Sequence, residues 1–165
     1  MKTTVSRCPV PADQVPIREY EEMRDSWFYS WGTQDLRTYL KPVVLIWLAS
    51  WIVTAPVAAA SFVPAQHWPQ FLISAALGGL ILPTLALLQL YIGWFHVGNR
   101  LRNQAVPYEE SGWYDGQVWV KPEDISNRDR LIVDYQVKPI LRRLQKTFAV
   151  MISLVLLASG LWQFL

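Results

Sequence analysis

The sequence has a single cysteine, Cys8, so an internal disulfide cannot form and nothing indicates an oxidising compartment. Acidic and basic residues are missing from two long stretches, 42–99 and 147–165, although the chain carries fifteen Lys and Arg and thirteen Asp and Glu elsewhere. A soluble protein rarely segregates its charges so completely, because its surface helices keep a polar face toward water. The charge distribution therefore favours an integral membrane protein.

Residues 1–11 lack the apolar core of a signal peptide and are too short for an organellar transit peptide. We therefore expect insertion through the protein's own helices, in the compartment where it is made. Pro9, Pro11 and Pro16 should keep this first part extended, because proline fixes its own φ and restricts the residue before it.

Signatures of common chemistries are absent as well: the sequence has no Gly-rich phosphate loop, no HExxH and no CxxC. The spacing of the acidic residues between 96 and 146 matches neither a metal site nor a glycosidase site. We therefore predict that the protein is not an enzyme, holds no metal and binds no nucleic acid.

Three apolar runs are long enough to cross a bilayer, namely 42–62, 71–95 and 147–165. A hydrocarbon core of about 30 Å needs about 20 residues at 1.5 Å each. None of the runs contains an acidic or basic residue, which argues against a transporter. The sequence predicts an all-α membrane protein with three transmembrane helices, preceded by an arm at 1–41 and joined by a link at 63–70 and a loop at 96–146.

All fifteen Lys and Arg lie in the arm and in the long loop. The positive-inside rule therefore places the N-terminus and the 96–146 loop on the cytoplasmic or stromal side. The 63–70 link and the C-terminus are predicted on the opposite, lumenal side. Membrane lipids are accordingly the first predicted partners.

The second span contains small residues at a four-residue spacing. Ser74 and Gly78 form a small-xxx-small pair, and Gly79 continues the small surface, which lets helix backbones approach closely. Pro83 removes a helical hydrogen bond and should kink the helix. Two interpretations stay open: packing within the protein, or a groove for another helix or a pigment.

The arm and the loop also contain periodic patterns. A helix is predicted from Ile17 to Gly32, with an apolar face formed by Ile17, Tyr20, Met23, Trp27 and Trp31. It either lies in the membrane interface or packs on the ends of the spans. In the loop, Gln117–Val120 predicts a strand of a small hairpin, and an amphipathic helix over 123–146 should break or kink at Pro139.

His96 lies at the cytoplasmic end of the second span. A histidine there can ligate the magnesium of a chlorophyll or a haem iron, but it is more commonly an interfacial polar residue. We predict no cofactor, while chlorophyll, carotenoid and haem stay open as alternatives.

Two stretches, CPVPADQVPIREYEEMRDSWFYSW and YEESGWYDGQVWVKPEDISNRDRLIVDYQVKPILRRL, carry a family resemblance. The chain resembles the plastid family known as hypothetical chloroplast reading frame 36, also described as conserved in the green lineage and diatoms. The resemblance implies a thylakoid membrane protein linked to photosynthesis and to tolerance of light or iron stress. It implies no reaction and no catalytic residue. Without a transit peptide, we expect a cyanobacterial or plastid-encoded member.

These observations together predict a non-enzymatic accessory factor in assembly, stabilisation or photoprotection of a photosynthetic complex, with photosystem or other thylakoid subunits as partners. Exposed aromatic and Arg side chains usually anchor interfaces, and they equally tie loops to the bilayer. Alternatives are a pigment or haem carrier that uses His96, Trp94 and the Gly78–Gly79 surface, and a membrane enzyme acting on lipid or carotenoid. The predicted partner contacts are Trp27, Trp31, Trp113, Tyr114, Trp119 and Arg130.

Overall fold

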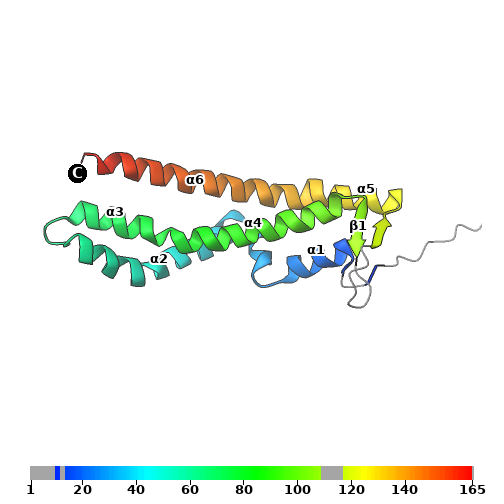
Figure 1. The fold of residues 1–165 in the computed structure, drawn as a ribbon, viewed down its shortest axis with the longest axis horizontal. Helices are drawn as coiled ribbons and strands as arrows, with labels where there is room; N and C mark the ends of the chain where they lie inside the picture. The colour runs from blue at the N-terminus through cyan, green and yellow to red at the C-terminus, as the bar shows by residue number, and fades with distance from the viewer. Residues whose placement is uncertain (1–9, 12–13, 109–116, 165) are drawn as a thin grey trace, which may run out of the picture. The chain divides into compact units, whose positions relative to one another are not determined.

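The computed structural model describes residues 10–11, 14–108 and 117–164, and it is mostly helical (Figure 1). The chain divides into two compact units: unit 1 comprises Met1–Ser30 and Gly93–Ile140, and unit 2 comprises Trp31–Ile92 and Leu141–Leu165. The elements in chain order are α1 (Pro16–Asp25), the 3₁₀ turn η2 (Tyr29–Thr33), α2 (Leu36–Ser61), α3 (Trp68–Gly79), α4 (Ile81–Arg102), β1 (Ala105–Tyr108), β2 (Gln117–Val120), α5 (Glu123–Ile132), the π-helical turn η3 (Val133–Val137) and α6 (Lys138–Trp162).

Within the described residues, three helical stretches are long and apolar enough to cross a membrane: Leu36–Ser61, Trp68–Arg102 and Glu123–Trp162. Each contains most of one predicted span, but each is longer than that span. At 1.5 Å per residue, the stretches of 35 and 40 residues reach about 50 and 60 Å, well beyond a hydrocarbon core of about 30 Å. Of the segment 96–146, the residues up to Arg102 continue α4, and those from Glu123 onward are helical, where we predicted an amphipathic helix.

Large apolar side chains are exposed along the helices of unit 2. In water such a surface would be a site of association. Against lipid it needs no cover, because hydrocarbon tails are as apolar as leucine. The exposed side chains, which match this expectation for membrane helices, include Leu45, Leu48, Ile52, Val53, Val57, Leu82, Leu85, Leu88, Val150, Ile152, Leu154, Leu156 and Leu157.

Helices α2 and α3 form an antiparallel hairpin in unit 2 (Figure 1). The connection is tight: the N–H groups of Gln66 and His67 both donate to the carbonyl of Val63, at 3.0 and 2.9 Å. Pro69 follows in the first turn of α3, where a missing N–H group costs nothing. The short link thus fixes the two helices as neighbours.

Glycines allow α2 and α3 to approach closely. A Cβ atom built on Gly78 would lie 3.3 Å from Thr54 Cγ2, and one on Gly79 would lie 3.2 Å from Trp47 Nε1. Thr54 Oγ1 also donates across the interface to the carbonyl of Ala75, at 3.1 Å. The small surface that includes Gly78 and Gly79 is therefore covered by α2 of the same chain. Ser74 lies one turn earlier on α3.

The second apolar stretch is interrupted at Leu80, between α3 and α4. Pro83 has no N–H group, so it cannot donate to the carbonyl of Gly79 four residues earlier. The Leu80 N–H donates to Leu77 at 3.1 Å, a tighter turn, and the Thr84 N–H then resumes the helical pattern by donating to Leu80 at 3.1 Å. The interruption lies next to Pro83, where we predicted a kink.

The part of α6 that belongs to unit 2 contacts α2 near both ends. Tyr39 is fully buried, and its hydroxyl lies 3.0 Å from Thr147 Oγ1. Farther along, the rings of Phe62 and Trp162 meet edge to face, with centroids 5.2 Å apart. These contacts complete a three-stretch helical unit.

In unit 1, the N-terminal helix is shorter than the predicted helix 17–32. It ends at Asp25, and Ser26 leaves the helical region with ψ at 137°. Serine favours caps and turns because its hydroxyl competes for backbone hydrogen bonds. Trp27 and Trp31 therefore do not continue the apolar face of α1, and that part of the prediction was wrong.

Strands β1 and β2 pair in an antiparallel sheet of unit 1, with Ala105 opposite Val120 and Tyr108 opposite Gln117. Tyr108 donates its hydroxyl to Gln117 Oε1 at 2.6 Å. Strand β2 coincides with the predicted strand, whereas β1 contains Pro107, which edge strands tolerate and sequence patterns disfavour. The turn dipeptides Ser111-Gly112 and Asp115-Gly116, which the sequence offers between the strands, lie outside the described residues.

The helix that leads into the third apolar stretch does not break at Pro139. It widens instead into the π turn η3, and the N–H of Lys138 donates to the carbonyl of Val133, five residues earlier. In a regular α-helix, the ring of Pro139 would crowd the carbonyl of Tyr135. In a π turn each N–H bonds to the carbonyl five residues earlier, so the helix is wider there and the carbonyl of Tyr135 need not lie against the proline ring. The helix therefore continues as α6.

Candidate functional site

Unit 1 is built around Trp94, which is fully buried. Its Nε1 donates to the carbonyl of Tyr29 at 3.2 Å, and its ring meets Tyr20 edge on, with centroids 6.0 Å apart. Gly93 permits this approach, because a Cβ atom there would lie 2.5 Å from Tyr29 Cε1. The Tyr20 hydroxyl donates to Gln136 in η3. Helix α1 is thus fastened to α4 and η3.

A partly buried ion pair joins Glu19 of α1 to Arg100 of α4. Arg100 also donates to the carbonyl of Gln14, at 3.0 Å, so it holds the segment before α1 as well. Burial raises the pKa of the Glu19 carboxyl above its ordinary value, and the Arg100 charge opposes that rise. The stability of unit 1 should therefore depend on the protonation of Glu19.

Lys121 and Asp129 form a buried ion pair, with side chains only 1% and 2% exposed. The Lys121 Nζ lies 2.7 Å from Asp129 Oδ2 and also donates to the carbonyls of Arg100 and Leu101, at 3.1 and 3.0 Å. Carbonyls in the last turn of a helix have no intrahelical partner. Lys121 therefore caps α4 from the end of β2 and holds α5 through Asp129, whose other oxygen accepts from Arg128 at 3.1 Å.

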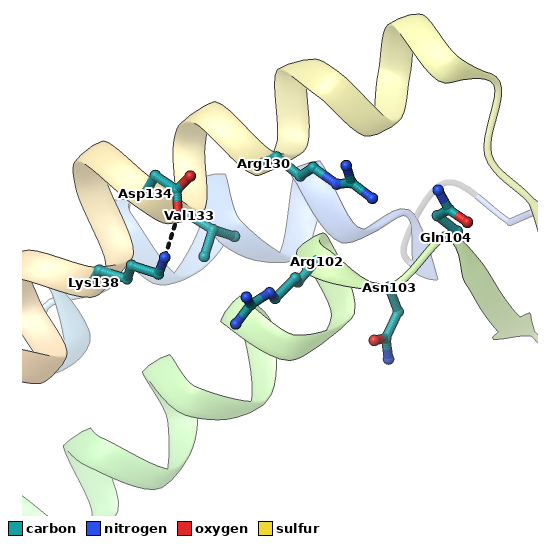
Figure 2. Close-up of a pocket in the computed structure, with 7 residues that line it drawn as sticks. All are labelled: Arg102, Asn103, Gln104, Arg130, Val133, Asp134 and Lys138. Atoms are coloured by element: carbon teal, nitrogen blue, oxygen red, sulfur yellow. Dashed lines mark ion pairs between the residues drawn. The ribbon is translucent and has the colours of Figure 1, made fainter.

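A basic pocket of about 530 Å³ lies between the end of α4 and the helical stretch α5–η3–α6 of unit 1. Figure 2 shows Arg102 projecting from the last turn of α4 and Arg130 from α5 into the space between these helices. Asp134 and Lys138 form an ion pair at 2.5 Å on the same side of the helical stretch. The residues that line the basic pocket are Arg102, Asn103, Gln104, Arg130, Val133, Asp134 and Lys138.

A second hollow, an apolar groove of about 480 Å³, lies in unit 2. Its walls come from α2, α3, α4 and α6, and Trp47, Leu77, Pro83 and Met151 are among them. The Trp47 Nε1 donates to the carbonyl of Ala76 at 3.1 Å, so the indole presents its apolar face. The groove therefore suits an apolar molecule, and it is distinct from the Gly78–Gly79 surface that we predicted.

His96 is exposed on unit 1 and lines a shallow pocket of about 370 Å³ together with Glu19, Glu22 and Tyr29. Among the residues that the structure describes, no group of three His, Cys, Asp or Glu side chains could hold a metal ion. Ligation of a chlorophyll or haem by His96 stays a prediction. Cys8 lies outside the described residues.

The predicted partner contacts fall into different environments. Trp27 is 90% exposed, just after α1, whereas Trp119 on β2 is half-buried. Arg130 is exposed and lines the basic pocket. Trp113 and Tyr114 lie outside the described part of the chain. Trp27 and Arg130 are thus the predicted contacts that the structure places within reach of a partner.

Trp31, which we predicted as an exposed partner contact, is instead buried in unit 2, and its Nε1 donates to the carbonyl of Tyr39 at 2.6 Å. Sequence reasoning also missed Arg102 and Lys138 as pocket residues. A signal was present for Lys138: Arg130, Asp134 and Lys138 recur every four residues, which places them on one helix face. Nothing in the sequence connects Arg102 to that face.

The fold and these sites define a small helical protein that has three helices able to cross a membrane and a polar unit with a basic pocket. The chain belongs to the CGLD27-like family, described as Conserved in the green lineage and diatoms 27, whose model matches residues 8–150. The family resemblance of the two sequence stretches is thereby confirmed. This assignment agrees with the order of arm, apolar stretches and loop along the chain.

Individual relatives agree with this membership. The chain is 43% identical over 143 residues to the Arabidopsis thaliana protein Conserved in the green lineage and diatoms 27, chloroplastic. The matched region covers 86% of this chain but only 44% of the length of that protein. It is 38% identical to the ycf36 protein of Porphyra purpurea, with 87% of each chain covered, and 38% identical to that of Pyropia yezoensis, with 94% and 92% covered. No solved structure matches the chain significantly.

Proposed function

We propose that the protein is a membrane-anchored accessory factor of plastid or cyanobacterial thylakoids, which binds a subunit of a photosynthetic complex during its assembly, stabilisation or photoprotection. It acts by binding and catalyses no reaction. Family membership and the chloroplastic name of the Arabidopsis relative support the compartment, and the three apolar helices support the anchor. In this proposal, the N-terminus and the segment 96–146 face the stroma or cytoplasm, where they meet the partner.

The exposure of Trp27 is the observation that carries the proposal. Its indole is 90% exposed, although α1 directly before it is fastened to α4 by Tyr20 and by the Glu19–Arg100 pair. A tryptophan side chain offers 150–250 Å² of apolar surface at little cost in conformational entropy. Tryptophans on well-ordered supports dominate the binding energy of many interfaces.

The test is affinity purification of the tagged full-length protein from thylakoids in mild detergent, with quantification of co-purifying subunits. Trp27→Ala should weaken binding by about 2 kcal/mol or more, roughly 30-fold, as for an interface anchor. Trp27→Phe should retain much of the binding. Trp68→Ala is the matched control, because Trp68 is also an exposed tryptophan but lies at the start of α3, within the segment 63–70 that we predicted on the opposite side.

The proposal predicts a defined set of photosynthetic subunits that is lost with Trp27→Ala and kept with Trp68→Ala. Recovery of the wild-type protein alone, under conditions that keep known complexes intact, would contradict it. Equal losses in both variants would assign the indoles to bilayer contact, because tryptophan also favours the headgroup region.

A second candidate function, a carrier of a pigment (chlorophyll or carotenoid) or of haem, is favoured by the apolar groove of unit 2. Leu77→Trp should fill the groove and displace a bound chromophore, whereas His96→Ala should displace it only if a histidine ligates it. An absorption spectrum of the gently purified protein measures both effects. A spectrum without any chromophore band would remove this candidate and leave the accessory function untouched.

A further inference from the structure

We propose that the basic pocket of unit 1 is a binding site for an oxyanion of the phosphate or sulfonate class, carried either by a lipid headgroup or by a soluble ester. The proposal concerns a ligand of the chain itself and stands independently of any partner subunit. Three cationic side chains, Arg102, Arg130 and Lys138, line the pocket, and Asp134 is the acidic residue among them. The lining therefore carries an excess of positive charge.

The nearby carboxylates form their ion pairs with other cations, although the charges of Arg102 and Arg130 also act on Asp134. Asp134 Oδ1 pairs with Lys138 Nζ at 2.5 Å. Asp129, which is next to Arg130 in sequence, is buried and pairs with Lys121 at 2.7 Å. Within the described residues, no hydrogen bond or salt bridge engages the guanidinium groups of Arg102 and Arg130. Both groups thus keep their donors for a ligand.

Capping of α4 does not account for Arg102 either. A cation in the last turn of a helix commonly binds the terminal carbonyls. Here Lys121 Nζ takes that role for Arg100 and Leu101, and the N–H of Asn103 donates to the carbonyl of Asn99 at 2.9 Å. With these carbonyls satisfied, Arg102 projects into the pocket (Figure 2).

The donor set matches a tetrahedral oxyanion. A guanidinium group presents parallel N–H donors that bind two oxygens of a phosphate at once, and an ammonium group adds a point charge. Asn103 and Gln104 also line the pocket, and their amide N–H₂ groups are donors of the same kind. A volume of about 530 Å³ accommodates a phosphate or sulfonate group together with its glycerol or sugar.

The position in sequence makes a lipid headgroup one natural source of the anion. Arg102 follows the charge-free stretch 42–99 by three residues, and Lys138 precedes the stretch 147–165 by nine. Basic pockets next to transmembrane helices are known to bind anionic headgroups. A soluble phosphate ester presents the same oxygens, so the experiment has to separate the two sources.

The test uses the full-length protein in neutral detergent. Native mass spectrometry counts phosphatidylglycerol molecules retained against phosphatidylcholine, and isothermal titration with inorganic phosphate and with glycerol 3-phosphate measures soluble anions. Arg102→Gln with Arg130→Gln should lower the affinity for the bound anion at least tenfold. Arg142→Gln with Lys146→Gln removes the same charge from two exposed positions outside the pocket and should leave the affinity within about twofold.

A gain-of-affinity variant protects the test from misfolding. Asp134→Asn releases Lys138 from its partner and adds one positive charge to the pocket, so it should tighten anion binding severalfold at low salt. Retention of phosphatidylglycerol alone identifies a headgroup site, and binding of glycerol 3-phosphate alone identifies a soluble ligand. Equal losses in the two Gln pairs, or a wild-type protein that binds neither anion, would overturn the proposal.

Discussion

Replacement of Lys121 by methionine tests how unit 1 is held together. The substitution keeps an unbranched side chain, one atom shorter, and removes the charge and the three donors of the ammonium group. It leaves the Asp129 carboxylate buried, with the partly exposed Arg128 as its remaining partner, and it uncaps the carbonyls of Arg100 and Leu101. The energetic question is how much this one ammonium group contributes to the ends of β2, α4 and α5.

The expected loss is about 3 kcal/mol. Removal of one member of a buried ion pair costs about 3–5 kcal/mol, because the other charge stays buried without compensation. We expect the lower end, since Arg128 Nη2 still lies 3.1 Å from Asp129 Oδ1. Lys138→Met is the matched control: its pair with Asp134 is solvent-accessible, and such pairs contribute about 1 kcal/mol or less.

Hydrogen exchange on the full-length protein in nanodiscs measures this loss locally. Amides of β2 and α5 should exchange about 100-fold faster in Lys121→Met, because each 1.4 kcal/mol changes the open population tenfold. The double variant Lys121→Met with Asp129→Leu should recover most of the loss, since no buried charge remains. The reasoning would be refuted by exchange in Lys121→Met no faster than in Lys138→Met.

Three further predictions concern packing and protonation. Gly93→Ala should lower the free energy of unfolding of unit 1 by about 1–3 kcal/mol, because the new Cβ would lie 2.5 Å from Tyr29 Cε1. Gly160→Ala is the control, because a Cβ there meets nothing within 4 Å and should leave the stability unchanged. Near-UV circular dichroism on heating compares the thermal midpoints of the two variants. Gly79→Leu should separate the α2–α3 hairpin and abolish monodisperse behaviour in detergent, measured by size-exclusion chromatography. Because burial raises the folded-state pKa of Glu19, its protonation stabilises unit 1 fully at pH values below the ordinary pKa of 4.5, and this contribution is lost as the pH rises through the folded-state pKa. Glu19→Gln should therefore flatten the pH dependence of the thermal midpoint between these two pKa values. An unchanged slope would show that Glu19 does not cause the pH dependence.

Some residues of the candidate sites could be predicted from the sequence, but which of them lie together could not. Arg130 and Trp27 were recognisable as side chains suited to contacts, because their residue types are typical of interfaces. Trp31 has the same chemistry but is buried, because its indole N–H reaches the carbonyl of Tyr39. Residue type alone cannot separate these outcomes, since exposure depends on which other segments come near.

The three apolar helices were determined by the sequence alone. Their signal is local: an uninterrupted stretch without charges must satisfy its backbone within itself and tolerates lipid on every side, so a helix is the outcome whatever the rest of the chain does. The four-residue spacing of Ser74 and Gly78 likewise indicates close helix packing from the sequence alone.

Only the tertiary structure decided where the polar residues meet. Lys121 caps a helix that ends nineteen residues earlier in the chain at Arg102, and Arg102 itself shares a pocket with Arg130 and Lys138. Such pairings depend on how β1 pairs with β2 and on the π turn before Pro139, and neither the pairing nor the π turn follows from the sequence pattern of one segment. Charges placed by long-range packing carry no local signal, because the energy that fixes them arises when separate segments exclude water together.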